Sequence, residues 1–448
     1  MTSVGIVGGG LLGMALAARL SRQGFRVTIL EAASRSGGLA APTRIGDYTW
    51  DRFYHVVLHS DEHLRALLEE LGLTERLHWR PTRTGFYIDG QLRSLSSSLE
   101  FLSFPFLGWV DKARLGATIL YASRIRAWRR LESILASEWL QRWSGSRAWK
   151  RLWLPLLRAK LGENAEVASA AFIWAIIARM YGARRTGMKR ETFGYVQGGY
   201  AAVLQAFDAY LGTLGVESVY DSAAIEVQSL DGRAEIRTAS GVREFDHVVL
   251  TVPCSRIADL CPQLRAQERT RLQAVRYQGI VCAVALLETP LADFYITNIT
   301  DPSVPFTAVI EMTALVDRNT FGGRALVYLP KYLTQQDPFW SRTDAQVETE
   351  FLEALERMYP HFRRRQVLAF QVSRVREMLA VTTLNYSARL LPETRTSLDR
   401  VFIVNSSQIA NGTLNVNETL GLAERKSREL ESLLGIPRAA SHAPAGTA

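Results

Sequence analysis

The stretch VGIVGGGLLGMALAARLSRQGFRVTILE, residues 4–31, decides the fold of this chain. Residues 4–7 are a short apolar run, which is typical of a buried parallel strand. Residues 14–22 carry apolar side chains at helical spacing, and residues 25–30 form a second strand-like run after Gly24. The sequence therefore predicts a strand, a turn, a helix and a second parallel strand, which is the beginning of a doubly wound α/β sheet.

The turn between the first strand and the helix contains Gly8, Gly10 and Gly13 in the spacing GxGxxG. In such a turn the first glycine permits the tight bend, and the second lets the backbone approach a pyrophosphate. The third lets helix and strand pack closely. The helix N-terminus, at Leu11 and Leu12, offers free N–H groups and a partial positive charge to the phosphates. The turn therefore predicts a dinucleotide-binding site.

The end of the second strand adds an acid and a second glycine-rich loop. Glu31 is placed to accept hydrogen bonds from a ribose diol, and its carboxylate would repel the 2′-phosphate of NADP. Beyond it, Arg35 precedes the pair Gly37-Gly38 and Leu39. A basic residue followed by this pair resembles the extended FAD motif of the FAD-dependent amine oxidase superfamily. That superfamily includes monoamine oxidases, protoporphyrinogen oxidases, carotenoid-type desaturases and, more distantly, UDP-galactopyranose mutases.

The resemblance implies an α/β fold and FAD as the cofactor. A Rossmann-like FAD-binding domain would be assembled from discontinuous segments and joined to a substrate domain with a mixed sheet and a helical cap. The FAD-binding segments are expected at residues 1–94, 194–276 and 395–435, the cap at 95–193, the mixed sheet at 277–394 and a disordered tail at 436–448. Apolar runs predict three strands at residues 224–227, 234–238 and 245–252, and a helix at 344–358.

The composition describes a globular protein with more than one structural unit. Hydrophobic residues make up 47% and charged residues 22% of the 448 positions. The net charge of +9 could attract anionic lipid, acidic substrates or nucleic acid, but the chain has no nucleic-acid motif, so we expect no nucleic-acid partner. Cys254, Cys261 and Cys282 form neither a paired framework nor a metal-ligand spacing, which favours a reducing compartment and no metal.

Two features bear on localisation. The chain begins almost directly with a strand, and no run reaches the roughly 18 apolar residues of a membrane-spanning helix, so we expect a cytoplasmic protein without a signal peptide. Aromatic side chains crowd residues 101–109 and arginines follow over 114–130, a combination that marks surfaces lying on membranes. A peripheral contact with the inner face of the membrane and a helical cap with a solvated basic face both stay open, as does a homodimer.

Candidate catalytic residues come from the resemblance and from histidine chemistry. Residues 51–55 lie where related flavoproteins run past the flavin, which assigns Tyr54 to the cofactor. His55 is a catalytic candidate because histidine titrates near neutral pH, and a packed, hydrogen-bonded histidine is the alternative. Lys331 follows a strand-like run at residues 324–329. It is the second candidate because a lysine that faces the flavin is common among relatives, and a surface position is the alternative.

The resemblance also places later segments on the cofactor. It implies a contact of the adenosine half with the backbone near Val227, and of the flavin with the segment that begins at Thr251 and ends at Pro253. The closing segment, residues 395–435, differs from the family because Asn405-Ser406 replaces the usual glycine and acid. The residues expected to contact the cofactor there are Asn405, Gln408, Asn415, Val416 and Asn417.

The chain has no hydrolase, metalloprotease, CxxC or kinase motif, which is consistent with chemistry carried by a cofactor. We therefore expect an FAD-dependent oxidoreductase that removes a hydride from a C–N or C–C unit of a bulky, apolar or amphipathic small molecule. One alternative is a non-redox flavin-dependent mutase acting on a nucleotide sugar, whose phosphates would be bound by Arg179, Arg184, Arg185 and Arg190. The other is a non-catalytic FAD-binding scaffold.

Overall fold

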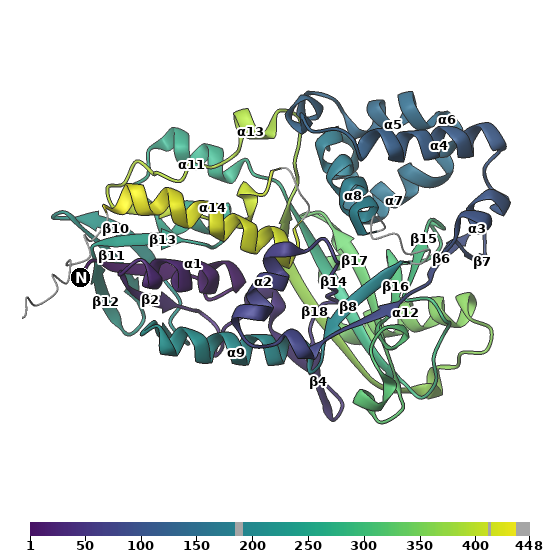
Figure 1. The fold of residues 1–448 in the computed structure, drawn as a ribbon, viewed down its shortest axis with the longest axis horizontal. Helices are drawn as coiled ribbons and strands as arrows, with labels where there is room; N and C mark the ends of the chain where they lie inside the picture. The colour runs from purple at the N-terminus through teal and green to yellow at the C-terminus, as the bar shows by residue number, and fades with distance from the viewer. Residues whose placement is uncertain (184–190, 411–413, 436–448) are drawn as a thin grey trace, which may run out of the picture.

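The first strand, β1 (Ser3–Val7), lies at the centre of a five-stranded parallel sheet in the computed structural model, which describes residues 1–183, 191–410 and 414–435. Its neighbours are β2 (Arg26–Leu30) and β13 (His247–Leu250), and the outer strands are β9 (Glu217–Val219) and β19 (Val401–Ile403). Every pairing in this sheet is parallel. Segments far apart in the sequence thus build one sheet, and the expected α/β fold is confirmed (Figure 1).

Side chains alternate between the two faces of this sheet. Val4, Ile6 and Phe402 face one group of helices. These helices are α1 (Leu11–Arg22), α2 (Glu62–Glu70), α9 (Gly199–Thr213) and α14 (Val416–Leu434). Val248 and Ile403 face the other way, onto a small antiparallel sheet and two helices. Those elements are β10 (Glu226–Leu230), β11 (Arg233–Thr238), β12 (Gly241–Phe245), α10 (Cys254–Leu260) and α11 (Ala266–Gln273).

The run expected as one strand over residues 245–252 is divided between two sheets. Phe245 ends β12 and His247 begins β13. Between them, the carboxylate of Asp246 accepts hydrogen bonds from the backbone N–H and the hydroxyl of Ser3, both at 2.8 Å. This contact turns the chain from the small sheet into the parallel one. The fully described residues 224–252 therefore contain strands β10 to β13 where the sequence predicts three.

The second large sheet has seven strands of mixed direction. In spatial order they are β18 (Val367–Ala380), β14 (Tyr277–Leu287), β17 (Ala325–Leu333), β16 (Ala308–Glu311), β15 (Ile296–Ile299), β6 (Thr84–Ile88) and β7 (Gln91–Ser94). Helix α12 (Asp344–Met358) packs on one face. Three shorter strands contribute side chains to the core on the other face: β3 (Pro42–Ile45), β4 (Tyr48–Asp51) and β8 (Thr192–Val196). Strand β8 pairs with β5 (Leu77–Pro81).

The residues between β7 and β8 form a layer of helices, seen at the upper right of Figure 1. They are α3 (Ser98–Ser103), α4 (Trp109–Ala122), α5 (Ala136–Ser144), α6 (Ser146–Ala148), α7 (Leu154–Leu161) and α8 (Ala170–Ala183). Trp139, Leu140 and Phe172 are buried inside this layer. No helix in the described ranges combines the length and the apolarity needed to cross a bilayer.

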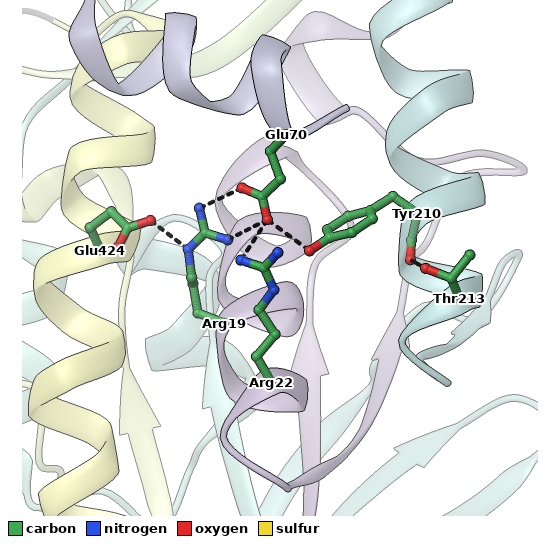
Figure 2. A network of polar contacts seen from close by, with 6 residues as sticks. All are labelled: Arg19, Arg22, Glu70, Tyr210, Thr213 and Glu424. Atoms are coloured by element: carbon green, nitrogen blue, oxygen red, sulfur yellow. Dashed lines mark hydrogen bonds and ion pairs between the residues drawn. The ribbon is translucent and has the colours of Figure 1, made fainter. Parts of the chain in front are cut away.

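Charged side chains tie the helices on the first face together (Figure 2). Arg19 on α1 donates to both carboxylate oxygens of Glu70 on α2, at 2.9 and 3.0 Å, and also pairs with Glu424 on α14. Tyr210 on α9 and Arg22 both contact the same carboxylate at 2.7 Å. Burial opposes ionisation of Glu70, but the hydrogen bonds from Arg19 and Tyr210 outweigh it and lower its pKa. The network therefore joins the helices that support β1.

Candidate functional site

The glycine-rich turn after β1 leaves little room for side chains. Gly8 has a backbone φ of +112°, which favours glycine. A Cβ on Gly13 would lie 2.0 Å from the carbonyl oxygen of Gly8, far inside contact distance, so α1 begins directly on the turn. At Gly10 the nearest atom to such a Cβ is the Cα of Gly38, 3.9 Å away. The turn therefore presents bare backbone to a bound group.

A second loop runs beside this turn. The N–H of Gly37 donates to the carbonyl of Gly9 at 2.8 Å, and a Cβ on Gly38 would lie 3.1 Å from the Cα of Gly10. Arg52, which follows β4, donates from Nη2 to the carbonyl of Gly38 at 2.8 Å. Its Nε is buried and has no hydrogen-bond partner among the described residues, so it is a donor left for a ligand. The sequence includes Arg52 in the segment 51–55, but no local pattern singles it out.

Glu31 lies at the carboxyl end of β2, beside the turn. Its carboxylate accepts hydrogen bonds from the N–H groups of Gly9, at 2.6 Å, and Ala33, at 2.8 Å. The first turn of α1 has neither a side-chain cap nor an acid, so the N–H groups of Leu11 and Leu12 suit an anion. Bare glycine backbone, a helix N-terminus and an acid at the strand end together fit the phosphates and ribose of an adenine dinucleotide.

The other residues expected near the dinucleotide lie around the same strand ends. Thr251 donates from Oγ1 to the carbonyl of Val7 at 2.9 Å, which joins the ends of β13 and β1. Pro253 precedes α10, and Val227 is fully buried in the cluster that contains Val7. The two remaining loop residues are Arg35, which is exposed, and Leu39, which is partly buried. The contacts of these residues with the cofactor stay predictions.

Side chains of the closing segment hold the turn after β19 through hydrogen bonds within the protein. Asn405 and Gln408 are buried, and their side chains bond within the protein. Asn405 donates from Nδ2 to the carbonyl of Val252 at 2.9 Å and accepts the N–H of Ser407 at 3.1 Å. Gln408 donates from Nε2 to the carbonyl of Pro392 at 3.0 Å. These two side chains shape the turn after β19, and their contacts with the cofactor stay predictions.

The asparagines that follow both cap helices. The side chain of Asn415 accepts the N–H of Glu418 at 3.0 Å, at the start of α14, whose first residue is Val416. The amide oxygen of Asn417 accepts the N–H of His63 at 2.9 Å, at the start of α2. Asn417 thus docks α14 on α2, and its contact with the cofactor stays a prediction. Contacts of Asn415 and Val416 stay predictions.

Tyr54 and Tyr332 connect the cofactor segment to the seven-stranded sheet. Their hydroxyl oxygens are 2.7 Å apart. Burial raises the pKa of Tyr332 to about 12 and that of Tyr54 well above its usual range, so both are neutral phenols. One O–H of the pair donates to the other oxygen, and the second O–H remains to donate elsewhere. The sequence does not predict this contact, because the predicted strand ends at Leu329 and leaves Tyr332 outside it. In the structure β17 continues to Leu333 and includes Tyr332.

His55 lies against the start of α9. Its Nδ1 is 3.6 Å from the carboxylate of Asp51, and its ring centre is 4.5 Å from that of Tyr200. Asp51 accepts the backbone N–H of Tyr200 at 2.7 Å. The buried Nδ1 of His55 has no hydrogen-bond partner in the described part of the chain. This placement resembles the packed alternative, although without the hydrogen bond, and a catalytic role for His55 stays a prediction.

Lys331 lies inside β17, on the face that α12 covers. Its Nζ donates to the carbonyl of Pro305 at 2.7 Å and is 4.8 Å from the centre of the Phe339 ring. Tyr332, the next residue, packs with the core on the opposite face, as strand alternation requires. Lys331 therefore points away from Tyr54, and a catalytic role for it stays a prediction.

Comparisons with known proteins agree with the dinucleotide geometry. The family described as flavin containing amine oxidoreductase matches residues 13–414. The "Putative flavin-containing monoamine oxidase AofH" of Mycobacterium tuberculosis is 23% identical over 262 residues, which are 55% of this chain and 56% of that protein. The chain thus spans about half the length of that curated relative.

Solved structures share the fold over nearly the whole chain. Putrescine oxidase bound to putrescine has a TM-score of 0.76 at 19% identity, covering 96% of this chain and 99% of that one. Reduced UDP-galactopyranose mutase has a TM-score of 0.74 at 14% identity, covering 97% and 96%. At such identities the likeness shows the fold alone. On the family match, the chain belongs to the flavin containing amine oxidoreductases, whose cofactor FAD fits the turn of Gly8, Gly10 and Gly13 beside Glu31.

Proposed function

We propose that this protein is an FAD-dependent oxidoreductase that removes a hydride from a C–N or C–C unit of a bulky, partly apolar substrate. When bound, FAD supplies the two-electron acceptor for that step. The chain's own residues have three tasks. The glycine turn, Glu31 and Arg52 hold the dinucleotide, and the aromatic residues around Tyr54 exclude water and orient the substrate.

The observation that carries the proposal is the contact between Tyr54 and Tyr332. Tyr54 belongs to the segment that reaches the glycine loop through Arg52, whereas Tyr332 belongs to the second sheet. Two neighbouring side chains are neutral as well, because burial raises the pKa values of Cys282 and Tyr328. A neutral aromatic wall with one O–H to spare, beside a dinucleotide site, suits a bulky apolar substrate that needs orienting by few polar groups.

The mutase alternative depends on arginines that bind nucleotide phosphates. Arg179 is the member of the expected cluster that the structure describes, and its Nη2 is 3.1 Å from the carboxylate of Asp61. Arg184, Arg185 and Arg190 lie outside the described residues. Because Arg179 is already paired with an acid, the described residues support the oxidoreductase over the mutase.

Anaerobic titration of the FAD-loaded protein tests the proposal. Amines and partly reduced cyclic hydrocarbons of matched size are added, and the flavin absorbance is followed. We expect at least one class to bleach the flavin, and air to restore the colour. A flavin that no compound bleaches contradicts the oxidoreductase and leaves the scaffold. Isomerisation of a nucleotide sugar only after dithionite reduction would establish the mutase instead.

We also propose that the helical layer rests on a membrane through the corner between α3 and α4. Leu99 is 78% exposed, Trp109 71% and Val110 72%. Lys112 is buried and donates to the carbonyl of Leu102, but Arg114, one helical turn after Val110 on α4, is an exposed cation beside the apolar side chains. Exposed aromatic and aliphatic groups next to basic ones are typical of surfaces that enter the headgroup region of anionic membranes.

A further inference from the structure

Lys160, on α7, carries a positive charge that the described residues leave uncompensated. Within the described ranges its Nζ makes neither a hydrogen bond nor an ion pair. The Nζ instead lies 5.4 Å from the centre of the Tyr332 ring. Burial, together with nearby Arg179, lowers the pKa of Lys160 to about 8, so the group is still mostly an ammonium at neutral pH.

The position of α7 brings this ammonium to the proposed substrate site. Helix α7 packs on β17, and the hydroxyl of Thr307 donates to the carbonyl of Ala159 at 2.9 Å, which fixes the helix beside the sheet. Figure 1 shows α7 and α8 standing over this sheet. Lys160 is surrounded by protein and yet keeps part of its surface accessible. The ammonium therefore lies beside the ring of Tyr332, one of the two tyrosines that we propose as part of the substrate site.

Among the residues that the structure describes, the charges around Lys160 do not balance. Arg179 on α8 pairs with Asp61 at 3.1 Å, and Asp61 also accepts the N–H of Leu58 at 2.9 Å. That pair is neutral overall, so Lys160 contributes one positive charge in excess. A buried charge without a partner is costly, and proteins normally pair it. A single excess charge suits a monoanion such as a carboxylate better than a phosphate dianion.

We propose that Lys160 binds a carboxylate of the substrate, so that the enzyme acts on carboxylic acids and disfavours diamines. The inference rests on the proposed function, because it assigns the substrate of the same site. The ammonium donates to one carboxylate oxygen, and the spare O–H of the Tyr54–Tyr332 pair is the neighbouring donor for the other oxygen. A substrate ammonium in the same place would meet a like charge.

Three ligands with one hydrocarbon body test this charge preference in the FAD-loaded protein. They are 3-phenylpropanoate, its amide and 3-phenylpropylamine, each titrated by calorimetry and by the change in flavin absorbance. We expect the acid to bind at least about tenfold more tightly than the amide, and the amine most weakly. In Lys160→Met the affinity for the acid should fall about ten- to hundredfold while that for the amide is unchanged. Lys160→Arg, which keeps the charge, should retain most of the preference.

Arg158→Met is the matched control, because Arg158 is an exposed cation on the same helix; all three affinities should stay as in the wild type. The proposal is overturned if the acid does not bind, binds no better than the amide, or is unaffected by Lys160→Met. It is also overturned if Lys160→Met releases FAD or shifts the flavin absorbance of the ligand-free protein, because Lys160 would then serve the cofactor. If no compound bleaches the flavin but the acid preference holds, the proposed redox function fails and the charge preference stands.

Discussion

The substitution Gly13→Ala probes the dinucleotide site most directly. The added Cβ would lie 2.0 Å from the carbonyl oxygen of Gly8, whereas ordinary contacts begin near 3.4 Å. The oxygen belongs to the backbone of a tight turn between β1 and α1, so it cannot rotate away as a side chain could. Restoring a normal contact requires α1 and the turn to separate by about 1.4 Å, the difference between these two distances.

A separation of this size moves the N–H groups of Leu11 and Leu12 out of hydrogen-bond range of a phosphate, since such bonds are only about 3 Å long. Each hydrogen bond to a charged group contributes about 1.5–3 kcal/mol. Losing one of them lowers the affinity for FAD roughly tenfold to more than a hundredfold. Overpacking at the helix start should also cost about 1–3 kcal/mol of folding stability.

The measurement is the flavin-to-protein ratio after purification, followed by titration of the deflavinated protein with FAD and thermal melting with and without FAD. Gly212→Ala is the control: Gly212 lies exposed in α9, a Cβ there would meet nothing within 4 Å, and alanine should raise stability by up to about 1 kcal/mol. If Gly13→Ala binds FAD as tightly as the wild type, the close approach of α1 to the turn does not determine cofactor binding and the reasoning is refuted.

Three further predictions concern other parts of the molecule. Glu70→Gln should lower the free energy of unfolding by about 1–3 kcal/mol at pH 7. Because the fold lowers the pKa of Glu70 below its usual 4.5, that loss should be full above this value and disappear as the pH falls through the lowered pKa; a pH-independent loss in thermal melting would contradict this. Tyr332→Phe should lower the free energy of unfolding in urea by about 1–2 kcal/mol. The double variant Tyr54→Phe with Tyr332→Phe should lose less stability than the sum of the two single variants, and strict additivity would argue against a contact between the two hydroxyls. Trp109→Ser with Val110→Ser should reduce cosedimentation with anionic vesicles severalfold at unchanged Tm, and equal binding would exclude this corner as the contact.

The beginning of the fold could be predicted because its determinants lie within residues 4–31. Apolar runs, the GxGxxG spacing and Glu31 act through contacts along one strand–turn–helix–strand unit, so local patterns suffice. The same holds for α12, where apolar spacing predicts a helix over residues 344–358 and the structure has Asp344–Met358. By contrast, the division of residues 245–252 between two sheets depends on a contact of Asp246 with Ser3, 243 positions away, which no local pattern reveals.

The direction of individual side chains was decided by the tertiary structure alone. Alternation along a strand predicts which residues share a face. Which element covers that face is decided by packing in the folded protein. Helix α12 covers the face of Lys331, whereas Tyr54 meets Tyr332 on the other. Likewise, Lys160 lacks a charge partner among the described residues because α7, α8 and β17 come together in space. Periodicity in a sequence identifies elements and their buried faces, while the pairing of polar groups depends on neighbours that chain order does not specify.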